Sequence, residues 1–194
     1  MTVENRPGAH LQDDRPKAAK AVLRQRMRAA RAGLVGPPLA LPKALEALLA
    51  SPGVIASYLP VRGEADPGAI ADAAFARGWR IAMPHVGARG APMRFLVWQP
   101  GDPLVPGPFG LRQPAADARP LAPDLILTPL VAFDGAGNRL GQGAGYYDRA
   151  FAGLPSARRI GIAWSFQQVP AVPVDAWDLP LHGIVTEQGW IDAQ

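Results

Sequence analysis

Short apolar runs alternate along this chain with alanine-rich stretches of helical period. The runs are nearly unbroken and rich in large apolar residues, so we predict a strand in each of 53–60, 79–86, 93–98, 124–133, 158–166 and 182–190. A run that is apolar at almost every position is typical of a strand covered on both faces. The alternation therefore predicts an α/β fold, a three-layer sandwich with a mostly parallel central sheet.

Between these runs, the pattern predicts helices at 16–33, 39–50, 66–78 and 146–152. In the third, we expect Asp66 to be the N-cap, Pro67 the first helical residue and Gly78 the stop. The run 124–133 is the most apolar of the predicted strands, 93–98 is expected at or near a sheet edge, and the proline-rich stretch 104–123 is expected to cross the surface.

The first predicted helix carries its cations at steps of three and four residues, so they share one face: Lys17, Lys20, Arg24, Arg28 and Arg31. We expect Val22, Leu23 and Met27 to pack inward. A basic helix face is most often solvated, and Arg26, Arg28 and Arg31 are interpreted as such a surface.

Composition narrows the class of protein. Residues 1–15 are polar and aperiodic and are predicted to be a flexible tail, followed by a single α/β domain at 16–194. No apolar run has the roughly 18 residues that a membrane span requires, and we expect no membrane association. There is no cysteine and no secretory leader is recognisable, so the expected location is the cytoplasm.

The net charge is +4, and the excess of Lys and Arg over Asp and Glu lies within residues 1–31. A basic protein attracts nucleic acid, nucleotides or acidic metabolites. A nucleic-acid-binding module stays open as an alternative on this charge alone, but the chain has no recognised nucleic-acid motif, and we expect no nucleic-acid partner.

The segment 138–151, NRLGQGAGYYDRAF, has glycines at alternate positions and follows the most apolar predicted strand. Ligands of α/β sheets bind beyond the carboxyl ends of strands. Gly141, Gly143 and Gly145 leave the backbone accessible, the following helix offers free N–H groups, and Arg139 and Arg149 flank the loop, an arrangement suited to phosphate. Glycines alone are weak evidence, and the spacing is neither that of dinucleotide-binding nor that of P-loop motifs.

The longer pattern is specific. Phe-Asp, a turn and NRLGQGAGYYDR, together with KAVLR, SYLPVRGEAD, GLRQP and WDLPLHGIVTE, resemble the 5-formyltetrahydrofolate cyclo-ligase family from about Lys20 to Thr186. The resemblance implies an ATP-dependent cyclo-ligase that converts 5-formyltetrahydrofolate into 5,10-methenyltetrahydrofolate, with release of ADP and phosphate. It implies phosphorylation of the formyl oxygen, which makes the formyl carbon electrophilic. ATP and Mg²⁺ are the expected co-substrate and cofactor, the partners are small molecules, and we expect a monomer.

The resemblance also assigns residues. Arg139, Glu64 and Tyr147 are the expected catalytic residues, and Asp148 and Asp178 the magnesium ligands. The folate is expected to contact Leu59, Glu64, Gly143, Ala144, Gly145, Tyr146 and Tyr147. ATP is expected to contact Lys20, Arg24, Arg139, Leu140, Gly141, Gln142, Gly143, Ala144, Gly145, Tyr146, Tyr147 and Asp148.

Other interpretations stay open at this point. Glu64 could be a solvated loop carboxylate, Asp148 a helix cap or a partner of Arg149, and one of the two tyrosines a core residue. Ala144 and Trp177 depart from the family pattern, which usually has glycine and histidine there. A folate-binding relative without turnover is therefore an alternative, as is another enzyme with a similar sheet, such as a sugar-phosphate isomerase or coenzyme A transferase.

Overall fold

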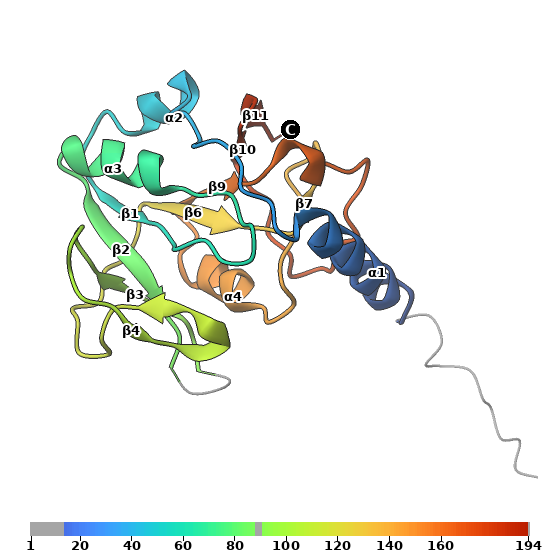
Figure 1. Ribbon diagram of the computed structural model, residues 1–194, viewed down its shortest axis with the longest axis horizontal. Helices are drawn as coiled ribbons and strands as arrows, with labels where there is room; N and C mark the ends of the chain where they lie inside the picture. The colour runs from blue at the N-terminus through green and yellow to red at the C-terminus, as the bar shows by residue number, and fades with distance from the viewer. Residues whose placement is uncertain (1–13, 88–90, 194) are drawn as a thin grey trace, which may run out of the picture.

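The computed structural model describes residues 14–87 and 91–193 and is built on a seven-stranded sheet (Figure 1). The strand order is β11-β10-β9-β6-β1-β2-β3. The inner five strands run parallel, and β3 and β11 close the two edges in antiparallel pairs. The strands are β1 (Val54–Ala56), β2 (Arg80–His85), β3 (Arg94–Val97), β6 (Leu125–Pro129), β9 (Arg158–Ile162), β10 (Gly183–Thr186) and β11 (Gly189–Asp192).

Helices cover both faces of this sheet, as the apolar runs predicted. On one face, α2 (Lys43–Leu48) and α3 (Gly68–Ala76) pack against Ile55, Leu125 and Leu127. On the other face, α4 (Tyr146–Gly153) inserts Phe151 against Val54 and Ile126. Neighbouring strand residues alternate between the two layers, which is the period of a pleated sheet. The predicted three-layer α/β sandwich is confirmed.

The helix boundaries follow local backbone chemistry. The first helix, α1, spans Asp14–Arg31 and so begins two residues before the predicted start, while the rest of the predicted tail lies outside the described residues. The second is shorter than predicted because Pro42 is its N-cap, and the residue before a proline disfavours helical angles. In α3 the N-cap is Pro67 and the first helical residue is Gly68, each one residue later than predicted. The Asp66 carboxylate accepts a hydrogen bond from the N–H of Gly68 (2.8 Å), and Gly78, with φ +84, follows the end of the helix as expected.

The predicted strand 124–133 is two strands, which corrects the sequence interpretation. After Pro129 the backbone leaves the main sheet, and β7 (Ala132–Phe133) pairs instead with β8 (Arg139–Leu140). The carbonyls at the break are satisfied by side chains, because Gln167 donates to the carbonyls of Leu130 (3.0 Å) and Val131 (2.8 Å). An apolar run reports burial but not the point at which the chain changes sheets.

The proline-rich stretch contains a small hairpin rather than surface loop alone. Its strands are β4 (Val105–Pro106) and β5 (Arg112–Gln113), joined through the 3₁₀ turn η1 (Pro108–Gly110). Gln113 anchors the hairpin to the end of β2 by bonding both the N–H (3.0 Å) and the carbonyl (3.1 Å) of Val86. A second 3₁₀ turn, η2 (Ser165–Gln167), ends the run that begins with β9.

The order of the strands reverses between β1 and β6, and ligands of open α/β sheets bind at such a switch point. The loop after β1 carries Glu64, and the chain after β6 leads to β7, β8 and the glycine loop. Figure 1 shows α1 beyond the end of the sheet toward which the arrow of β6 points, beside β7. Within the described residues, no helix has the length and apolar character needed to cross a membrane.

Candidate active site

The glycine loop presents a row of free backbone N–H groups. Within the described part of the chain, none of the N–H groups of residues 141–148 donates a hydrogen bond to a protein acceptor. Gly143 and Gly145 have φ +102 and +67, angles that favour glycine. Gly145 is the N-cap of α4 and offers no side chain to its first turn, so this helix terminus is open to an anion.

Arg139 is fixed beneath this loop by the β7–β8 ribbon. It lies opposite Phe133 in that ribbon, and the turn between them is held by the buried carboxylate of Asp134. That carboxylate accepts N–H groups of Ala136 (3.0 Å), Asn138 (3.0 Å) and Val172 (2.9 Å). The segment 134–138, DGAGN, is thus a tight turn, and it positions Arg139.

The Arg139 guanidinium is only partly satisfied. The residue is 8% exposed, its Nη2 donates to Asp148 Oδ1 at 2.5 Å, and its guanidinium lies 4.7 Å from the centre of the Phe151 ring. Its Nε is buried without a hydrogen-bond partner among the described residues. An orphan donor is costly in a folded protein, and here it lies on a cation next to free N–H groups.

The basic face of α1 points toward the loop. Arg24 Nε donates to the carbonyl of Gly141 (2.9 Å), and Arg28 donates to Gln142 Oε1 and to the Gln142 carbonyl, both at 3.0 Å. Lys20 and Arg31 are 7% and 2% exposed. The interpretation of Arg31 as solvated was therefore wrong, whereas Arg26 and Arg28 are exposed as expected.

The apolar expectation for α1 also needs a correction. Met27 is buried and Leu23 packs beside it, but Val22 is 68% exposed. Lys20 and Arg31, which are buried, and Arg24, which is half-buried, use the helix face that apolar residues would otherwise occupy. Long basic side chains can be buried in this way when carbonyls and carboxylates meet their charged ends.

Lys20 meets two carboxylates from the other end of the chain. Its Nζ lies 2.6 Å from Asp175 Oδ2 and 2.7 Å from Asp178 Oδ2. Burial opposes the charge, but the hydrogen bonds to both carboxylates outweigh it and raise the pKa of Lys20. Asp175 was not among the predicted site residues, and its only sequence signal was its place in the DAWD segment.

The two predicted magnesium ligands are both paired with cations. Asp148 bonds Arg139, and Asp178 bonds Lys20 and the N–H of Asp175 (2.9 Å). Among the described residues, no three histidine or acidic side chains gather closely enough to hold a metal ion. The carboxylates fit only a cation that arrives with phosphate oxygens and water, which is the usual manner of Mg²⁺ at nucleotides.

Glu64 is a buried carboxylate, which excludes the solvated alternative. Its side chain is 6% exposed and lies 3.5 Å from Arg31 Nη2. Oε2 accepts the N–H of Val61 (3.2 Å), and Oε1 accepts Nε2 of Gln142 (3.2 Å). Burial raises the pKa of Glu64, and Arg31 together with these donors opposes that rise.

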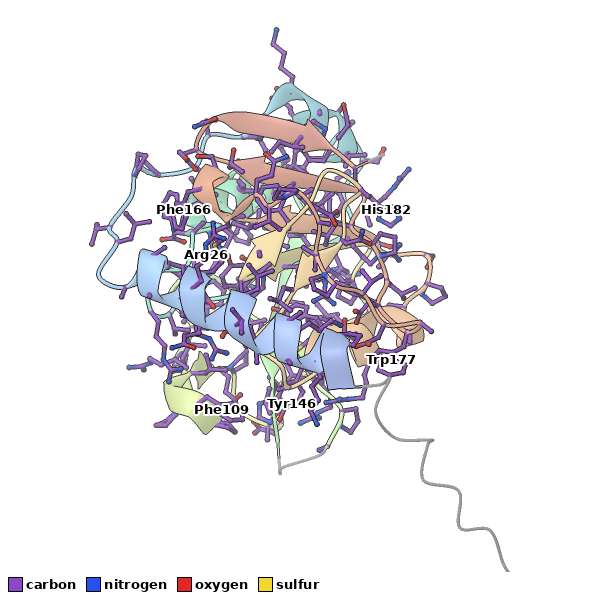
Figure 2. All side chains as sticks on the ribbon, turned by 90° about the vertical axis from the view of Figure 1, so that its right-hand side faces the viewer. Arg26, Phe109, Tyr146, Phe166, Trp177 and His182 are labelled. Atoms are coloured by element: carbon purple, nitrogen blue, oxygen red, sulfur yellow. The ribbon has the colours of Figure 1, made fainter. Side chains whose placement is uncertain are left out.

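The two tyrosines have different environments. Tyr147 packs against Phe151 (6.1 Å between ring centres), and burial, followed by the charge of Glu64, raises its pKa. Tyr146 lies edge-on to Phe109 (6.4 Å), below α1 in Figure 2. Tyr147 is therefore the one with core contacts, and Tyr146 belongs to the accessible side of the site.

The remaining predicted residues and Trp177 have different environments. Leu59 is 36% exposed in the loop between β1 and Glu64. Leu140 is buried in the ribbon, and the carbonyl of Ala144 accepts a bond from Arg149 (3.2 Å). Trp177 is 70% exposed and lies near the N-terminal end of α1 in Figure 2. It presents an indole to solvent where the family pattern has an imidazole.

Comparisons with known proteins agree with this geometry. The model of the 5-formyltetrahydrofolate cyclo-ligase family matches residues 16–187. A 5-formyltetrahydrofolate cyclo-ligase from Escherichia coli (strain K12) is 34% identical over 140 residues, 68% of this chain and 76% of the relative. One from Mycolicibacterium smegmatis is 30% identical over 158 residues, 77% of this chain and 81% of the relative.

Solved structures give the same result for the fold. A 5,10-methenyltetrahydrofolate synthetase from Aquifex aeolicus superimposes with a TM-score of 0.67 at 26% identity, covering 90% of this chain and 93% of that one. One from Mycoplasma pneumoniae gives 0.62 at 24% identity, covering 90% and 99%. Since the match runs through the basic helix, the glycine loop and the DAWD segment alike, this chain belongs to the 5-formyltetrahydrofolate cyclo-ligase family of enzymes.

Proposed function

We propose that this enzyme uses ATP to cyclise 5-formyltetrahydrofolate to 5,10-methenyltetrahydrofolate, with release of ADP and phosphate. The observation that carries the proposal is the row of unbonded N–H groups at 141–148 beside the guanidinium of Arg139, whose Nη1 lies next to Gly141. Donors left free around a fixed cation are suited to the oxygens of a transferring phosphoryl group.

The chemistry requires such a site. A formyl amide is a poor electrophile, and its oxygen is a poor leaving group. Transfer of the γ-phosphoryl group to that oxygen gives an iminium phosphate, the neighbouring folate nitrogen attacks the carbon, and phosphate leaves as the ring closes. The protein must align the two substrates and neutralise the charge that spreads over the phosphoryl oxygens.

The residues of this chain divide that task between two sides. Arg139, the loop amides and the first turn of α4 face the phosphoryl group, and Arg24 reaches the loop from α1. Glu64, Leu59 and Tyr146 form the side assigned to the folate, where the ionised Glu64 is suited to hold a polar N–H of the pterin. Packing of Tyr147 against Phe151 fixes the start of α4 between the two sides.

Mg²⁺ is proposed to enter with the nucleotide. Asp148 and Asp178 would hold it together with phosphate oxygens, and its charge would offset that of the triphosphate. Their present partners, Arg139 and Lys20, would then be available to the phosphate oxygens that accompany the metal. Action as a monomer in the cytoplasm stays a prediction.

The test is formation of 5,10-methenyltetrahydrofolate, followed by its absorbance, from 5-formyltetrahydrofolate with and without ATP and Mg²⁺. We expect product only when both are present. No product from the complete mixture, or equal rates without ATP, would refute the proposal. Retention of RNA or DNA that weakens steeply with salt would favour the nucleic-acid-binding alternative instead.

A further inference from the structure

Arg31 connects α1 to both strands that flank the switch point. It is the last residue of α1 and is 2% exposed. Its Nε donates to the carbonyl of Arg62 in the loop after β1, and its Nη1 donates to the carbonyl of Leu130 after β6, both at 3.2 Å. Two carbonyls from different loops therefore fix the guanidinium whether or not an acid is near it.

The third contact of this guanidinium is Glu64. Arg31 Nη2 lies 3.5 Å from Glu64 Oε1, and both side chains are almost fully buried, at 2% and 6% exposed. The distance is that of a close ion pair rather than a short hydrogen bond. Water screens the attraction between these two buried charges only weakly. Arg31 can therefore set the position of the Glu64 carboxylate without occupying all of the hydrogen-bonding capacity of its oxygens.

Gln142 holds the same carboxylate from the glycine loop. Its Nε2 donates to Glu64 Oε1 (3.2 Å) while its Oε1 accepts Nε of Arg28 (3.0 Å), so the two neighbours determine the orientation of the amide. Glu64 is thus supported from α1 directly and from α1 through the loop. Its other oxygen accepts only the N–H of Val61 among the described residues.

Without a neighbouring cation, Glu64 would be unsuitable for binding a polar ligand group. A buried carboxylate without a cation either takes up a proton or turns toward water. Burial does raise the pKa of Glu64, and Arg31 is the principal group that opposes this. Arg31 itself is enclosed by backbone and Glu64, so it has no route to a substrate.

We propose that Arg31 is a positioning residue, which holds Glu64 ionised and oriented toward the folate, and that Gln142 completes this support from the nucleotide loop. The inference rests on the proposed function and adds to it a residue whose effect reaches the folate only through Glu64.

Steady-state kinetics of the full chain with 5-formyltetrahydrofolate and ATP test this inference. We expect Arg31→Met to raise KM for the folate by about 10-fold while KM for ATP changes less than about 3-fold. In a Glu64→Gln background the same substitution should change the folate KM by less than about 2-fold, because no carboxylate remains to be positioned. Arg26→Met, on the exposed side of α1 opposite Tyr146 in Figure 2, should match wild type.

A merely structural role predicts different results. Arg31→Met would then lower the amount of active enzyme, affect both substrates alike and act equally in both backgrounds; any of these overturns the proposal. Arg31→Gln, which keeps a donor for the two carbonyls but no charge, is measured in the same two backgrounds and by the same criteria if Arg31→Met does not fold. If the wild type turns over and Arg31→Met has equal effects in both backgrounds, the positioning role of Arg31 is refuted while the proposed function stands. Absence of turnover in wild type removes the proposed function and this inference with it.

Discussion

Substitution of Arg139 is expected to lower activity strongly while changing the free energy of unfolding little. Replacing Arg139 by methionine keeps an unbranched side chain in the space above Phe151 and removes the guanidinium. The proposed phosphoryl transfer then loses a fixed cation at the point where charge spreads. Loss of a single preorganised donor of this kind costs about 100-fold to 1000-fold in kcat, and we expect Arg139→Met to fall in that range.

Stability should change little, because the contributions of Arg139 to folding nearly cancel. The pair with Asp148 stabilises by about 1 kcal/mol, since the carboxylate is 28% exposed and can return to water. The contact with the Phe151 ring adds about 1 kcal/mol. Against these, the buried Nε without a partner costs about 1–3 kcal/mol, a cost that methionine removes. The free energy of unfolding should therefore stay within about 1 kcal/mol of wild type.

The assay pairs urea denaturation of wild type and Arg139→Met with initial rates of methenyltetrahydrofolate formation at saturating ATP. Arg26→Met provides the control for loss of one positive charge from the protein. A rate within 10-fold of wild type would show that Arg139 has no direct part in the transfer. A loss of stability well above 1 kcal/mol would show that the orphan donor has a partner in solution, and the reasoning from its burial would fail.

Three further predictions concern the buried or paired carboxylates of Asp134, Glu64 and Asp178. Asp134→Ala should lower the free energy of unfolding, measured by urea denaturation, by about 3–5 kcal/mol, because three backbone N–H groups lose their acceptor. The control Asp117→Ala, on the surface, should change the free energy of unfolding by less than about 0.5 kcal/mol. Because burial raises the pKa of Glu64 above 4.5, kcat/KM for the folate should fall as pH drops through that raised pKa, and Glu64→Gln should not show this acidic fall in kcat/KM. The effect of Glu64 on stability runs the other way with pH: its contribution is greatest below the pKa of the unfolded state and is lost as pH rises through the pKa of the folded state. Asp178→Asn should raise the Mg²⁺ concentration for half-maximal rate by about 10-fold, measured at fixed ATP, and an unchanged Mg²⁺ requirement would remove Asp178 from the proposed metal site.

The layers of the fold were available from the sequence because they depend on local patterns. Runs such as 79–86 are apolar at nearly every position, which a strand covered on both faces requires, and Gly78 marks a helix end by its own backbone freedom. The glycine loop was recognisable for the same reason, since its conformation needs Gly143 and Gly145 at positive φ. The division of 124–133 at Pro129 was not recognisable, because either strand alone is an apolar run.

The roles assigned to the candidate site residues stay predictions, and the contacts between these residues could not be predicted from the sequence. The spacing of Lys20 and Arg24 placed them on one helix face, and the structure directs that face at the loop. The same spacing gave Arg28 and Arg31 the same face, and we interpreted both as solvated, since a basic stripe most often lies in water; Arg28 is exposed, but Arg31 is buried. Their partners, Gln142, Leu130 and Glu64, are distant in sequence and could not be named from the helix itself.

The sequence by itself therefore determined the α/β layers, the accessible backbone at 141–145 and the family to which the chain belongs. Only the tertiary structure decided that α1 buries Lys20 and Arg31, that Lys20 meets Asp175 and Asp178, and that Glu64 is enclosed with Arg31. The physical reason is that helical or strand geometry follows from neighbours in the chain, whereas a charge can be buried only where oxygens from remote segments converge to satisfy it.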